Sequence, residues 1–130
     1  RRRYVLAAAV GHTRGVFTVG GKPVDVPMQD FTGFVGQWDS RVVDGRIVDP
    51  DHLVPAFIKR DPIAWVGTHR HGPDGKNEPY VFCYLFKYAI DLPEGTKSVV
   101  LPDNRRIRIL AATVAADVND DARPAALLYD

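Results

Sequence analysis

Hydrophobic and β-branched residues occur along the chain in short runs that are separated by glycine, proline, aspartate and asparagine. This pattern predicts short β-strands joined by tight turns. Two glycines at 20–21 separate the runs 15–19 and 24–28 and predict a hairpin, because paired glycines supply the positive φ that tight hairpin turns require. The other strands are expected at 4–10, 31–38, 41–43, 47–48, 63–71, 80–90, 97–101 and 106–116.

The run 80–90 is the longest predicted strand, and its residues alternate between two faces. One face carries Tyr80, Phe82, Tyr84, Phe86 and Tyr88, and the other carries Val81, Cys83, Leu85 and Ala89. Because both faces are apolar over much of the run, we expect a central strand that is covered on both sides. About eight to ten short strands at this spacing predict an all-β fold, an antiparallel β-sandwich of the jelly-roll type.

Three segments are less clear in the pattern. Residues 49–62 contain three prolines and predict a long connection, and residues 72–79 predict a loop. The alanines of 106–116 suit a helix, but Ile107, Ile109 and the preceding turn favour a strand. The length of 130 residues and a hydrophobic content of 45% fit one domain, 1–130.

Charge and cysteine content exclude several classes of partner and site. The net charge is +1, which disfavours binding to nucleic acid or to acidic membranes, and no apolar run reaches the ~18 residues of a membrane span. The triplet 1–3 is expected to be a solvated end or an exposed strand start. A single cysteine excludes an intrachain disulfide and fits both a cytoplasmic protein and a secreted bacterial domain.

Catalytic signals are weak. There is no Gly-x-Ser-x-Gly motif, and Cys83 lies within a predicted strand, where an inert buried thiol is expected. His69 and His71 have the i, i+2 spacing of some metal sites, but Asp39, Asp74 or Glu78 would be a third ligand only if the fold brought one of them near. We therefore predict no enzyme activity in this domain, and no cofactor or metal.

Aromatic and polar residues that suit sugar recognition occur together in two segments. One contains Trp38, Asp39 and Arg41, and the other contains Trp65, His69, Arg70 and His71. Aromatic faces stack on the C–H surfaces of sugars, and polar groups bind their hydroxyls. If the segments converge, they would form one carbohydrate-binding patch. In the alternative interpretation both tryptophans are core residues.

These segments also carry a family resemblance. Residues 33–41, 65–71 and 84–88, with 92–95, 107–109 and 128–130, resemble a C-terminal, non-catalytic region of bacterial α-mannosidase-type glycoside hydrolases (family thirty-eight). The resemblance implies a galactose-binding-like accessory β-sandwich in a longer chain, with a mannose-type glycan and the parent's catalytic domain as partners. The nucleophilic aspartate and the zinc ligands of that family belong to a separate domain, so no catalytic residue is expected here.

Three functions therefore compete. The first is a carbohydrate-binding accessory module, and the second is a structural module that packs against the rest of a multidomain enzyme. The third, which the residues favour least, is a small zinc-dependent enzyme that uses His69 and His71.

Overall fold

The structure is a computed structural model that describes residues 1–33, 42–43, 46–47 and 59–117. These residues form strands and no helix. The strands are β1 (Arg2–Ala9), β2 (Thr13–Val19), β3 (Lys22–Met28), β4 (Val42–Val43), β5 (Arg46–Ile47), β6 (Ile63–His71), β7 (Asn77–Asp91), β8 (Val99–Val100) and β9 (Ile107–Ala115).

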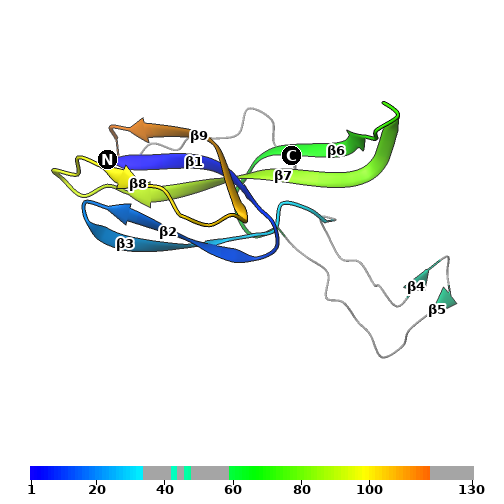
Figure 1. Ribbon diagram of the computed structural model, residues 1–130, viewed down its shortest axis with the longest axis horizontal. Coiled ribbons are helices and arrows are strands. Elements are labelled where there is room, and N and C mark those ends of the chain that lie inside the picture. The colour runs from blue at the N-terminus through cyan, green and yellow to red at the C-terminus, as the bar shows by residue number, and fades with distance from the viewer. Residues whose placement is uncertain (34–41, 44–45, 48–58, 118–130) are drawn as a thin grey trace.

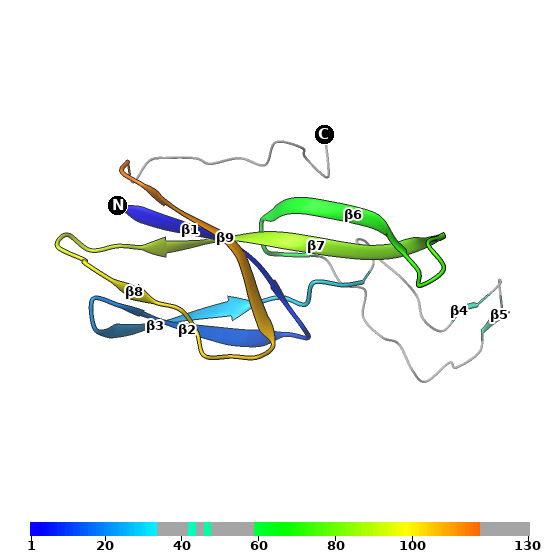
Figure 2. The ribbon, with the colours of Figure 1, turned by 45° about the horizontal axis from the view of Figure 1, so that its top comes forward.

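The strands form two packed sheets and a small hairpin. One sheet has four strands in the order β6-β7-β1-β9, and the other has three in the order β3-β2-β8. Every strand pair is antiparallel, including the separate pair β4-β5. In Figures 1 and 2 the two larger sheets lie face to face, and the β6–β7 hairpin extends beyond them at one end. The predicted all-β antiparallel sandwich is confirmed.

The core lies between the two sheets and follows from the period-two alternation of their strands. Val5 of β1, Phe17 of β2, and Tyr84, Phe86 and Ile90 of β7 are its largest fully buried side chains. Strand β7 lies between β6 and β1, so its predicted central position is confirmed. Removing such side chains from water supplies most of the stability of a β-sandwich.

The opposite face of β7 is less covered than the sequence predicts. Cys83 and Leu85 are half-buried there, and Ala89 is exposed. The expectation that both faces of this strand are covered is therefore wrong for the outer face. The sequence pattern did not distinguish the two faces, because a valine, cysteine or leucine can lie in a core or on a partly covered outer face.

The β2–β3 hairpin forms at the predicted position. Gly20 and Gly21 have φ values of 55° and 83°, and Val19 pairs with Lys22 across them. This is the two-residue turn that paired glycines favour. Strands β4 and β5 pair with each other and overlap the strands expected at 41–43 and 47–48. The ambiguous run 106–116 is the strand β9, as expected.

Two predicted boundaries are corrected. The loop expected at 72–79 ends earlier, because Asn77–Pro79 already pair with His69–His71, and a register shift precedes this pairing. Proline is tolerated in strands at such bulges and on open strand edges, and Pro79 of β7 lies beyond the residues of that strand that pair with β1. In the run 97–101 only Val99–Val100 form a strand.

The strand expected at 31–38 is described only up to residue 33. There Thr32 makes an isolated bridge to Cys83 and no longer ladder. Residues 34–38, and 49–58 of the long connection, lie outside the described part of the chain.

Candidate functional site

The outer face of β6 carries a half-exposed tryptophan. Trp65 keeps 54% of its surface accessible, so it is not one of the core residues. Atom Cη2 of its indole lies 2.8 Å from the point where a Cβ on residue 67 would be, and Cζ3 lies 3.2 Å from it. The ring can lie along the strand only because residue 67 is a glycine. The indole therefore covers Gly67 with an apolar surface.

Two imidazoles continue this face toward the tip of the β6–β7 hairpin. Positions 65, 67, 69 and 71 share one face of β6 by period two, and the extra residues at the register shift belong to β7. The rings of His69 and His71 are both exposed, lie 5.4 Å apart between centroids and meet edge to face. Trp65, His69 and His71 therefore lie on one face of the strand, and we call them the β6 face.

Arg70 is not part of the β6 face. Its position lies on the opposite side of the strand, where its guanidinium forms an ion pair with Glu78 of β7. Both side chains are partly exposed, so the pair contributes at most about 1 kcal/mol to stability. The sequence grouped Arg70 with the histidines because they are adjacent, whereas a strand separates neighbours onto opposite faces.

Trp38, Asp39 and Arg41 lie outside the described residues, so their convergence with the β6 face remains a prediction. The described residues do show where the segment that carries them begins. The backbone N–H of Tyr84 donates to the carbonyl of Phe31 at 2.8 Å, and Thr32 bridges Cys83. Cys83 pairs in turn with Gly67, beneath the Trp65 ring. Thr32 and Gly67 are thus separated by two strand spacings, about 10 Å.

A buried lysine that the sequence pattern did not predict joins the residues on either side of the segment 34–58. We call this segment the connection 34–58. Lys59 is 9% exposed, and its ammonium donates to the carbonyl of Asp30 at 3.0 Å and to that of Thr32. The ammonium also lies 5.2 Å from the centre of the Tyr84 ring, and the Tyr84 hydroxyl donates to the carbonyl of Gly33 at 2.8 Å. Burial lowers the pKa of Lys59, and the charges of Asp30 and Asp61 oppose this shift.

A second set of hydrogen bonds fixes the residues on either side of this lysine. The Tyr88 hydroxyl donates to Oδ2 of Asp61 at 2.7 Å and accepts from the backbone N–H of Gln29 at 3.1 Å. The side-chain oxygen of Gln29 accepts from the backbone N–H groups of Arg60 and Asp61 at 2.9 and 3.3 Å. Burial and the hydrogen bond to Asp61 raise the pKa of Tyr88.

The carboxylate of Asp30 completes the base of the connection. It accepts from the backbone N–H of Gly11 and from the backbone N–H and hydroxyl of Thr32. Burial alone would raise the pKa of Asp30, but these hydrogen bonds and the charge of Lys59 outweigh it and lower the pKa. No periodic pattern signals this network, because its partners come from residues 29–33, 59–61 and 84–88, far apart in the sequence.

The described residues offer little for metal binding or membrane crossing. Among them, no three histidine, cysteine or acidic side chains come together in a way that could hold a metal ion. The same residues contain no helix of the length and apolarity that a membrane span needs. Cys83 is half-buried rather than buried, and its sulfur lies 2.9 Å from the point where a Cβ on residue 67 would be.

Comparison with known proteins identifies the family. A family model described as the AziU2-like β-sandwich domain matches residues 1–118. The chain belongs to this family. The match supports the β-sandwich fold and does not link the chain to the α-mannosidase-type glycoside hydrolases. No curated protein and no solved structure matches this AziU2-like domain.

Proposed function

We propose that this AziU2-like domain binds carbohydrate on the β6 face and catalyses no reaction. The observation that carries the proposal is the Trp65 indole, which is 54% exposed and lies over Gly67, on the face of β6 that also carries the two imidazoles. Tryptophan is highly buried on average in folded proteins, so a half-exposed indole leaves a large apolar face available for stacking. Such a ring stacks on the apolar face of a pyranose, while ring nitrogens of His69 and His71 exchange hydrogen bonds with its hydroxyls.

The second predicted segment would complete the patch. Asp39 and Arg41 supply an acceptor and a planar donor for vicinal hydroxyls, and Trp38 supplies another stacking face. The anchoring of residues 31–33 beside Cys83 supports this convergence, because the connection leaves the sheet close to the β6 face. The resemblance of the sequence favours a mannose-type ligand and a glycoside hydrolase as the parent chain, both of which belong to this proposal.

Calorimetric titration with methyl α-mannoside and with mannose oligosaccharides tests the proposal. We expect dissociation constants on the order of 0.1 to 1 mM, since a stacked face and a few hydroxyl contacts must offset the entropy of binding. Trp65→Ala should abolish binding and leave a cooperative melt. Leu110→Ala, which truncates a side chain that is 57% exposed on β9, is the matched control and should bind as the wild type does.

A packing role is the second candidate, and exposed aliphatic side chains favour it. Val16 and Val100 lie on the three-stranded sheet and Leu110 and Val114 on β9, all with 49–59% of their surface exposed. In this case Trp65 would be covered by another part of a larger protein. The titration separates the two candidates: no heat with any glycan would favour packing over carbohydrate binding.

A further inference from the structure

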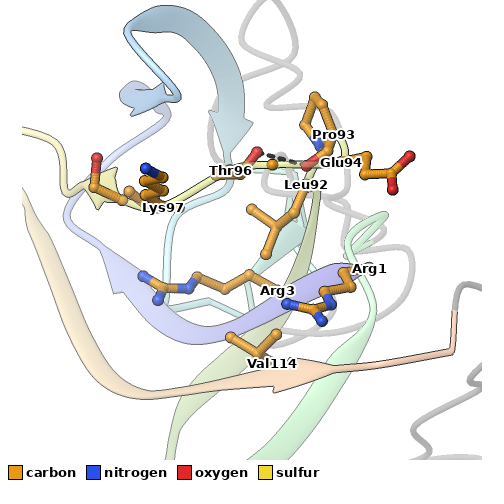
Figure 3. A pocket seen from close by; sticks show the side chains of 11 residues that line it. Arg1, Arg3, Leu92, Pro93, Glu94, Thr96, Lys97 and Val114 are labelled. Carbon is orange, nitrogen blue, oxygen red and sulfur yellow. Dashed lines mark hydrogen bonds between the residues drawn. The ribbon is translucent and has the colours of Figure 1, made fainter.

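A cleft of about 830 Å³ lies at the other end of the sandwich from the tip of the β6–β7 hairpin. It is bounded by the start of β1, the turn between β7 and β8, and the end of β9 (Figure 3). Its lining residues are Arg1, Arg3, Leu92, Pro93, Glu94, Gly95, Thr96, Lys97, Ser98, Val99 and Val114. A cleft of this volume is within the range of small-molecule sites.

Positive charge predominates in the cleft, and the alternation of β1 explains why. Arg1 and Arg3 project to the cleft side, whereas Arg2 pairs with Asp91 at 2.8 Å and does not line the cleft. Lys97 adds a third cation, and Glu94 is the one acidic residue of the lining. Within the described residues, none of these three cations forms an ion pair. The triplet expected to be a solvated end therefore contributes two side chains to a concave surface.

Arg3 is the residue that most needs a partner. Its Nε is buried and has no hydrogen-bond partner in the described structure. Buried donors are almost always paired in folded proteins, because an unpaired donor has lost its water without replacement. An oxyanion in the cleft would bind the terminal nitrogens of the same guanidinium, because a guanidinium binds carboxylate or phosphate oxygens in a bidentate manner.

The remaining walls are preformed and partly apolar. The turn 92–98 is held by the N–H and hydroxyl of Thr96, which donate to the carbonyl of Pro93 at 3.1 and 2.7 Å (Figure 3). Leu92, Val99 and Val114 supply apolar surface. A bare inorganic ion would leave most of this volume and surface unused.

We propose that this cleft binds a small organic oxyanion, a carboxylate or phosphate ester with an apolar body. Arg3 binds the charged group, Arg1 and Lys97 supply further positive charge, and the apolar body lies against Leu92 and Val114. The proposal does not depend on carbohydrate binding at the β6 face, because the two sites share no residue.

Titrations of the full chain with phenyl phosphate, benzoate, inorganic phosphate and neutral benzyl alcohol, followed by NMR, test this proposal. We expect phenyl phosphate or benzoate to shift the Arg3 Nε–H and the amides of Thr96, Lys97 and Ser98, with dissociation constants on the order of 0.1 to 1 mM that weaken as salt is added. The preferred probe identifies the charged group. Benzyl alcohol should leave these resonances unchanged, and inorganic phosphate should bind more weakly than phenyl phosphate.

Single-residue variants decide whether the cleft is responsible. Arg3→Gln and Lys97→Gln should each weaken binding by about tenfold or more, the second without risk to the fold because Lys97 lies on an exposed turn. Arg2→Gln removes the same charge from the same strand but outside the cleft, and should change affinity by less than about twofold. The absence of shifts at these resonances up to about 10 mM of either organic anion would overturn the proposal, as would equal weakening by Arg2→Gln and Arg3→Gln.

Discussion

Removal of one buried hydroxyl tests the network that anchors the connection 34–58. In Tyr88→Phe, Asp61 loses a donor at 2.7 Å and the N–H of Gln29 loses one of two acceptors. A hydrogen bond to a carboxylate contributes about 1.5–3 kcal/mol, and one between neutral groups about 1 kcal/mol. The N–H of Gln29 keeps its second acceptor, Oδ2 of Asp61 at 3.1 Å, so the lower part of this range applies. We expect Tyr88→Phe to lower the free energy of unfolding by about 2 kcal/mol.

The same variant should change the pH dependence of stability in a defined direction. The pKa of Tyr88 is raised in the folded state by burial and by Asp61, so its contribution is fully present below the unfolded value near 10 and is lost as the pH rises above it. Above about pH 10 this residue alone should remove up to about 1.4 kcal/mol per pH unit from the free energy of unfolding. Tyr88→Phe should lack this component.

Urea unfolding at neutral and alkaline pH measures both effects. Tyr84→Phe is the matched control, because it removes a hydroxyl from the same strand whose acceptor is the neutral carbonyl of Gly33. The control should lose only about 1 kcal/mol. A smaller loss in Tyr88→Phe than in Tyr84→Phe, or an alkaline slope unchanged by Tyr88→Phe, would refute this account of the network.

Three other predictions concern the core, an acidic group and the thiol. Phe86→Ala should lower the free energy of unfolding by about 3 to 5 kcal/mol because its side chain is fully buried. Phe82→Ala should lower it clearly less because its side chain is half-buried, and equal losses in urea unfolding would mean that the packing is misassigned. The ionised form of Asp30 is stabilising because its pKa is lowered, so the wild type should lose stability as the pH falls below about 4. Asp30→Asn should not show this component, and acid unfolding curves that coincide for the two proteins would contradict this. Cys83 should react slowly with a thiol reagent in the native state and faster in Trp65→Ala, because the indole and the thiol lie over the same glycine; identical rates would show that the ring does not cover the thiol.

The sequence predicts those parts of the fold that depend on local patterns. Hydrophobic and β-branched runs bounded by turn residues identify β6 and β9, and alternation identifies the two faces of β7. Gly20-Gly21 identifies the first hairpin, because strands and tight turns are decided by residues close in sequence. The buried Lys59 is not predictable in this way. Its acceptors are carbonyls about thirty residues earlier in the chain, and these come near only once the sheet has formed.

The structure places Trp65, His69 and His71 on one face of β6 and Arg70 on the other, and the use of these residues as a binding site stays a prediction. Trp65, His69 and His71 share a face because their positions along the strand differ by even numbers. Arg70 is an odd number of positions from each of them, so its side chain lies on the other side. The cleft around Arg3 depends on three segments that are distant in sequence, so the basic triplet alone predicted only an exposed strand start.

The most direct test of carbohydrate binding is an NMR titration of the ¹⁵N-labelled chain with methyl α-mannoside, in which the two tryptophan side-chain N–H resonances are followed. We predict a saturable shift of the Trp65 resonance, with a dissociation constant on the order of 0.1 to 1 mM, and accompanying shifts at His69 and His71. A parallel shift of the Trp38 resonance would show that the two segments converge on one ligand. If neither tryptophan resonance moves up to about 50 mM of this sugar or of mannose oligosaccharides, the β6 face is not a site for mannose-type carbohydrate.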